Sequence, residues 1–134
     1  MCEDASVSER WQKGLEAYAS QFGIEPGQVW EHMSGVVGER MATEAIESAA
    51  GAWVDDCLDL RVRSLIVLTA LIVQGGVEAR MRGHVRWAVD HGATREELEA
   101  MCALIAVYAG YPKASVGVEV VRDELDRLEA GGSV

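Results

Sequence analysis

The chain has 134 residues, 49% of them hydrophobic, and a formal net charge of −10 at pH 7. This length and composition are sufficient for a domain with a buried core, so they argue against a chain that is disordered over most of its length. The acidic balance argues against nucleic acid or an anionic membrane surface as a partner, because both are polyanions that attract basic patches.

Helical spacing of apolar residues predicts three helices in the first part of the chain. The first covers about 7–21 and has one apolar side. The second, at about 28–39, is interrupted by Gly35 and Gly38, which are poor helix formers. The third, at 41–53, has an apolar strip rich in alanine, and small residues in such a strip indicate close helix packing.

The most hydrophobic element of the chain is predicted to be a helix at 60–74, with Asp59 as its N-cap. Between Ser64 and Gln74 its only polar residue is Thr69. A helix that is apolar nearly all round is buried on several sides, so this one lies either at the centre of the domain or against another subunit. Its β-branched residues would also suit a strand, but its length favours a helix.

A helix around His84 comes next, and His84 lies at the edge of its apolar stripe. This helix is predicted to end at Gly92, because glycine tolerates the left-handed backbone that closes many helices. Thr94 and Glu97 then form a capping box for a further helix at 95–109.

The last predicted helix covers about 113–128, and Pro112 is suited to its first turn. Gly117 is a poor helix former and the residues around it alternate like a strand, but apolar residues farther on continue at helical spacing, which favours a helix. The charged residues expected on its outer face are Arg122, Asp123, Glu124, Asp126 and Arg127.

The sequence has no strong internal repeat and no linker that would divide it into domains, so we expect a single domain over 1–134. Residues 1–6 and 129–134 are expected to be loose tails. Residues 1–4 are acidic where a signal peptide would be basic, and no apolar run approaches the ~20 residues that span a bilayer. We therefore expect a cytoplasmic protein that does not enter a membrane.

His84 is the first candidate for chemistry. A helical histidine beside an apolar stripe can act as a general acid or base, because burial and neighbouring charges move its titration into the working range. The alternative is a partly buried histidine that is tied to a backbone or carboxylate partner. Arg80 precedes His84 by one helical turn and Arg63 lies beside the buried helix, so either cation could bind a carboxylate substrate. Arg82 and Arg86 are interpreted as a solvated face.

The cysteines and the remaining residues support other chemistry poorly. The three cysteines are an odd number without C-x-x-C spacing, which argues against a disulfide framework, a zinc ribbon and a dithiol redox centre. Cys57 follows Trp53 in a connector and is either a pocket thiol or a small packing residue, while Cys102 is expected in the core. His91 is expected to be only a favourable charge at a helix C-terminus. No H-E-x-x-H spacing, phosphate-binding glycine loop or G-x-S-x-G elbow occurs, so we expect no metal site.

Five segments of the chain form an ordered set of motifs, namely RWQKGLE (10–16), LRVRSL (60–65), RGHVRWA (82–88), HGATREEL (91–98) and VYAGYPKA (107–114). In this order they resemble the carboxymuconolactone decarboxylase family. Its patterns H-[LV]-R-x-A, N/H-G-[AV]-T-x-E-E-[LI] and Y-A-G-x-P are specific as an ordered set, and the start of the chain is similar to the family's R-Y-x-x-G-L-E opening.

The resemblance implies an all-α domain of about six helices, of the kind shared with AhpD-like alkylhydroperoxidases and assembled as a homotrimer or homohexamer. It also implies an enzyme without a cofactor that acts on a small carboxylated lactone. In that reaction His84 would supply a proton, and Arg80 or Arg63 would bind the anion. The other substrate-binding residues expected from the resemblance are Trp53, Cys57 and Tyr108.

Two departures from the related families narrow this expectation. AhpD-type peroxidases place a cysteine pair seven and four residues before the histidine, where this chain has Val77 and Arg80, so a disulfide-cycling peroxidase is not expected. The decarboxylase carries W-x-R-P-G-L in the connector, where this chain has Asp55 in place of the arginine. We expect a decarboxylase or related lyase for a small cyclic or aromatic-derived carboxylic acid or lactone. The alternatives are a non-catalytic binding or accessory protein of the same fold and, third, a thiol-dependent peroxidase.

Overall fold

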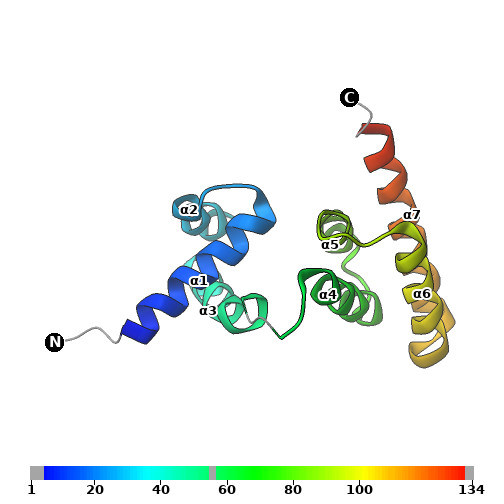
Figure 1. Cartoon of the computed structure of the whole chain (residues 1–134), viewed down its shortest axis with the longest axis horizontal. Coiled ribbons are helices and arrows are strands. Elements are labelled where there is room, and N and C mark those ends of the chain that lie inside the picture. The colour runs from blue at the N-terminus through cyan, green and yellow to red at the C-terminus, as the bar shows by residue number, and fades with distance from the viewer. Residues whose placement is uncertain (1–4, 55–56, 132–134) are drawn as a thin grey trace. The chain divides into compact units, whose positions relative to one another are not determined.

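The computed structural model describes residues 5–54 and 57–131, and in these ranges it consists of seven α-helices without a strand. The all-α class is confirmed, with one helix more than the resemblance implied. The chain divides into two compact units, which are Met1–Cys57 with α1 to α3 and Leu58–Val134 with α4 to α7 (Figure 1). The single domain expected over the whole chain stays a prediction. The helices are α1 (Ala5–Phe22), α2 (Pro26–Val37), α3 (Glu39–Trp53), α4 (Leu60–Gln74), α5 (Glu78–Asp90), α6 (Arg95–Ala109) and α7 (Tyr111–Gly131).

The predicted helix ends in the second unit are confirmed where local capping sets them. The Asp59 side chain accepts a hydrogen bond from the Val62 backbone N–H at 2.8 Å and so caps α4. At the start of α6, the Glu97 N–H donates to Thr94 Oγ1 and the Thr94 N–H donates to Glu97 Oε1, each at 3.1 Å. Gly92, after the end of α5, has a φ of 98°, which favours glycine over any other residue.

The expected loose tail at 129–134 is wrong for its first three residues, because α7 continues to Gly131. The last turns of this helix are tied to α6 by Arg95. Its Nη2 donates to Asp126 Oδ1 at 2.8 Å and to Glu129 Oε1 at 3.0 Å. A contact between residues this far apart in sequence does not appear in the local pattern, which explains the error.

The first unit is a packed group of three helices. Trp11 and Trp30 place their rings 5.8 Å apart beside its core. A Cβ atom added at Gly14 of α1 would overlap the backbone carbonyl oxygen of Ile46 in α3, so the two backbones approach closely at this point. The alanine-rich strip of α3 is buried, which confirms the predicted close packing. The buried core residues are Ala19, Val29, Met33, Ala42 and Ile46.

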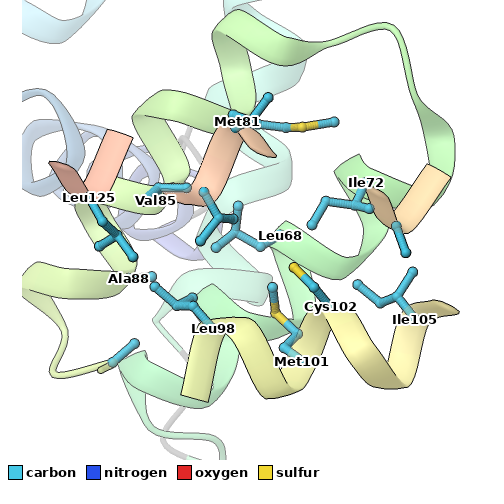
Figure 2. Close-up of a cluster of buried hydrophobic side chains, with 14 residues drawn as sticks. Leu68, Ile72, Met81, Val85, Ala88, Leu98, Met101, Cys102, Ile105 and Leu125 are labelled. Atoms are coloured by element: carbon cyan, nitrogen blue, oxygen red, sulfur yellow. The ribbon is translucent and has the colours of Figure 1, made fainter. Parts of the chain in front are cut away.

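In the second unit α4 packs against α5, α6 and α7. Lys113 of α7 caps the C-terminus of α4, where its Nζ donates to the Val73 carbonyl oxygen at 2.7 Å. The outer side of α4 is not covered, and Ile66 there is 53% exposed. Within residues 5–54 and 57–131, no helix is both long and apolar enough to cross a membrane. The four helices of the unit share a core that includes Leu68, Ile72, Met81, Val85, Leu98, Cys102 and Leu125 (Figure 2).

Glu124 corrects the prediction that the charged residues of α7 all lie on the outer face. It is only 7% exposed and lies where α7 packs against α5. Its carboxylate oxygens are each 3.5 Å from a guanidinium nitrogen, one of Arg82 and one of Arg86. These two arginines are therefore ion-paired to α7, and the interpretation of them as a merely solvated face is wrong.

We expect Gly14→Ala to destabilise the first unit by about 1–3 kcal/mol, because the backbone of α3 must move to admit the methyl group. Gly35→Ala is the matched control, since nothing lies within 4 Å of a Cβ atom at that helical position. Alanine is the better helix former, so the control should be neutral or slightly stabilising. Urea unfolding followed by circular dichroism measures both. A Gly14→Ala protein as stable as the wild type would show that α1 and α3 do not pack this closely.

Candidate functional site

His84 lies on α5 with its imidazole ring partly buried. Its Nδ1 atom is fully buried and has no hydrogen-bond partner among the residues that the structure describes. A buried polar atom without a partner costs free energy, so such atoms are rare in folded proteins and call for an explanation. A ligand that supplies the missing partner is one such explanation. The alternative of a histidine tied to a backbone or carboxylate group receives no support at this atom.

The surroundings of His84 disfavour its charged form. Burial, and then the positive charge of Arg80, lower the pKa of His84 below its ordinary value of 6.5. Arg80 is exposed on the preceding turn of α5, so the structure brings these two predicted site residues together. The imidazole is therefore neutral near pH 7, and the exposed cation of Arg80 lies on the same side of the helix.

Arg63 is a buried residue of the second unit, and its expected role in binding an anion stays a prediction. It lies in the first turn of α4 and is only 8% exposed. It is not among the groups that shift the pKa of His84. A buried guanidinium needs partners within the protein, so we interpret Arg63 first as a residue that stabilises the fold.

The sequence interpretation of His91 is incomplete. His91 does follow α5 directly as its C-cap residue, as predicted. In addition, its Nδ1 is 2.7 Å from the Oγ of Ser64, a residue that is 1% exposed on α4. This hydrogen bond joins the start of α4 to the end of α5. The local sequence pattern does not indicate this partner, because Ser64 and His91 are 27 residues apart.

Tyr108 lies at a different surface feature of the second unit. Its side chain is 86% exposed at the end of α6 and lines an open groove of about 570 Å³ between α4 and α6. The lining of this groove does not include His84, Arg80 or Arg63, so the structure does not bring Tyr108 together with them. The groove is mainly apolar, with Leu65, Val73, Met101, Leu104 and Ile105 among its lining residues.

Two predicted residues belong to the first unit. Trp53 is the last residue of α3 and is partly buried, and Cys57 is exposed at the end of the unit. Asp55, which distinguishes this chain from the decarboxylase pattern, lies outside the described residues. The expected roles of Trp53 and Cys57 in substrate binding stay predictions.

Cys102 is buried in the core of the second unit, as predicted. Burial, and then the charge of Glu99, raise the pKa of its thiol to about 11, so it is protonated near neutral pH. Among the described residues, no three or more His, Cys, Asp or Glu side chains gather closely enough to bind a metal ion. The chemically distinctive group in the second unit is thus His84 with its neighbours.

His84 is expected to make the stability of the protein depend on pH. Its pKa is lower in the folded chain, so the unfolded chain takes up a proton first as the pH falls. The stability that neutral His84 contributes to the fold is fully present above pH 6.5, the ordinary pKa of histidine. It is lost as the pH falls through the lower pKa that His84 has in the folded chain. His84→Gln cannot titrate and should lose less stability than the wild type between about pH 7.5 and about pH 5. Urea unfolding at both pH values measures the difference, and equal losses would rule out the lowered pKa.

Comparison with known proteins supports the motifs found in the sequence. No curated protein matches the chain. A family model described as the carboxymuconolactone decarboxylase family matches residues 42–123. The matched stretch is more than half of the chain and contains α4, α5 and α6 entire, with Arg80, His84 and Tyr108. The resemblance read from the motifs is confirmed, and the chain belongs to the carboxymuconolactone decarboxylase family.

Proposed function

We propose that this chain is a decarboxylase or related lyase that acts without a cofactor on a small cyclic or aromatic-derived carboxylic acid or lactone. In this proposal His84 is the acid–base residue and Arg80 binds a carboxylate of the substrate. The observation that carries the proposal is the buried Nδ1 of His84, which has no hydrogen-bond partner in the described part of the chain, beside the cation of Arg80. Membership of a family named for a decarboxylase supports the reaction class.

Substrate binding and protonation of His84 are coupled in this mechanism. A guanidinium binds a carboxylate through charge-assisted hydrogen bonds, and Arg80 is exposed and able to do so. The substrate carboxylate neutralises the charge that disfavours the imidazolium form of His84, so the pKa of His84 rises in the complex. His84 then takes up a proton from solvent while the substrate is bound.

The decarboxylation step then balances without an oxidant or reductant. The bond between the carboxylate carbon and the neighbouring carbon breaks, carbon dioxide leaves, and the electron pair stays on a carbon conjugated with the lactone carbonyl. The reaction needs hydrogen-bond donors at that carbonyl to stabilise the developing charge. The imidazolium of His84 donates its proton to the carbon, so one carboxylate and one proton yield carbon dioxide and a new C–H bond.

A thiol-dependent peroxidase has less support. Val77 and Arg80 stand where AhpD-type peroxidases have their cysteine pair. The thiol of Cys102 is buried, and its raised pKa of about 11 leaves almost no reactive thiolate near neutral pH. Cys57 is exposed but has no second cysteine at C-x-x-C spacing. Proton transfer by His84 therefore fits these residues better than a thiol redox cycle.

The activity test uses a panel of carboxymuconolactone and related lactone acids, with release of carbon dioxide as the measurement. We expect turnover by the wild type and a loss of about a hundredfold or more in His84→Ala, the usual contribution of a general acid or base. Arg80→Gln should mainly raise KM. Arg127→Gln removes an exposed charge from α7, away from His84, and serves as the matched control with wild-type kinetics. The assignment fails if the wild type and His84→Ala are equally inert on the whole panel, and a ligand bound without turnover would favour the non-catalytic alternative.

We also propose that the protein works in the cytoplasm as a homotrimer or homohexamer. The support is an uncovered apolar surface on the second unit, which includes Ile66, Leu104, Val107 and Tyr108. Burying such a surface against another copy removes it from water. Light scattering should give three or six times the mass of the chain, and Val107→Glu should shift the protein to smaller species. Val36→Glu, at an exposed apolar position of the first unit, is the matched control. A clean wild-type monomer would refute the proposal.

A further inference from the structure

Trp87 lies in direct ring contact with His84. The two residues are three positions apart on α5, and their ring centroids are 4.7 Å apart at an interplanar angle of 79°. Side chains on a helix lean toward its N-terminus, so Trp87 leans over the turn that carries His84. Edge-to-face contact at this distance is a favourable geometry for two aromatic rings. Both side chains are partly buried, so the contact withdraws part of each ring from water.

The contact matters because no group in the described residues forms a hydrogen bond with Nδ1 of His84. In many catalytic sites a carboxylate or backbone carbonyl binds one imidazole nitrogen and thereby fixes the orientation of the ring. Nδ1 of His84 is buried without such a partner among the described residues. The interaction that the structure does show for this ring is its packing against Trp87.

We propose that Trp87 is a positioning residue for His84, and that its indole ring holds the imidazole in one orientation and shields one side of it from water. The proposal deepens the proposed function and rests on it for its catalytic meaning. An oriented imidazole delivers its proton to one carbon of the substrate, and a shielded one passes less of that proton to water. Trp87 itself takes no part in bond making or breaking.

The charged groups near α5 also affect the pKa of His84, so their effect must be separated from that of the Trp87 ring. Arg80 lies on the same side of α5 as His84 and disfavours its charged form. Of the helices that pack on α5 within the unit, α4 contributes Arg63, and α7 contributes Glu124 and Asp123, which is also paired with Arg82. Glu124 pairs with Arg82 and Arg86, which leave α5 on the side opposite His84. A Trp87 variant leaves all these charges in place, so a change in the titration of His84 reports the ring.

The test is an NMR titration of the three histidines in the full chain, with His84 assigned by comparison with His84→Gln. In the wild type we expect cross-relaxation between the His84 and Trp87 ring protons and a His84 pKa below 6.5, its ordinary value. In Trp87→Leu that pKa should rise by about 0.5, because water reaches the ring. Trp87→Phe keeps an aromatic ring and should restore most of the wild-type pKa. Tyr111→Leu removes an exposed aromatic side chain at the start of α7 and is the matched control.

The outcomes distinguish this inference from the proposed function. A wild type without cross-relaxation between the two rings overturns the inference and needs no variant to fold. A folded Trp87→Leu protein with an unchanged His84 titration overturns it as well, even if decarboxylation is found. If the pKa rises in Trp87→Leu and returns in Trp87→Phe, the positioning role stands, even if no lactone acid is turned over. Where turnover is found, the pH profile of kcat should move with the His84 pKa in Trp87→Leu.

Discussion

The rotation of α5 about its own axis is the constraint on which the candidate site depends. Its apolar side is buried in the core of the second unit through Met81, Val85 and Ala88. A second side, opposite His84, is held to α7 by the pairing of Arg82 and Arg86 with Glu124, which is itself buried. Because one side of α5 is packed in the core and another is paired with α7, the side that carries His84 cannot turn into the core. Burial of the Glu124 carboxylate is favourable only while its arginine partners are in place, so the pairing also resists slippage of the helix.

The electrostatics of the site follow from this placement. One face of α5 combines a cation, a partly buried imidazole and an indole ring from Arg80, His84 and Trp87. Burial and the cation both favour the neutral imidazole, whereas an anionic ligand would remove the second effect. Protonation of His84 is therefore unfavourable without an anion beside Arg80 and becomes more favourable when an anion is bound. Such a response suits acid catalysis on a carboxylate, because an imidazolium with a low intrinsic pKa is a strong proton donor.

The second unit has another feature that the chemistry of His84 does not use. The groove between α4 and α6 is apolar, and its rim carries Leu104 and Tyr108. The groove lies beside the uncovered side of α4. This helix is the most hydrophobic of the chain, yet only part of its surface is buried in the core. The Ser64–His91 hydrogen bond, by contrast, joins α4 to α5 within the unit and belongs to the scaffold that positions the site.

The sequence by itself determined the helices, the helix ends that local caps set, the family, and His84 as a candidate. Helical periodicity and the caps at Asp59 and Thr94 depend on residues a few positions apart, so they are visible in the chain. Tertiary structure alone decided that Glu124 is buried and that His91 binds Ser64. It also decided that Tyr108 lines a groove away from His84 and that Nδ1 of His84 has no hydrogen-bond partner within residues 5–54 and 57–131. The physical reason is that the energy of a charge or polar atom depends on groups brought from other helices, and local spacing carries no record of them.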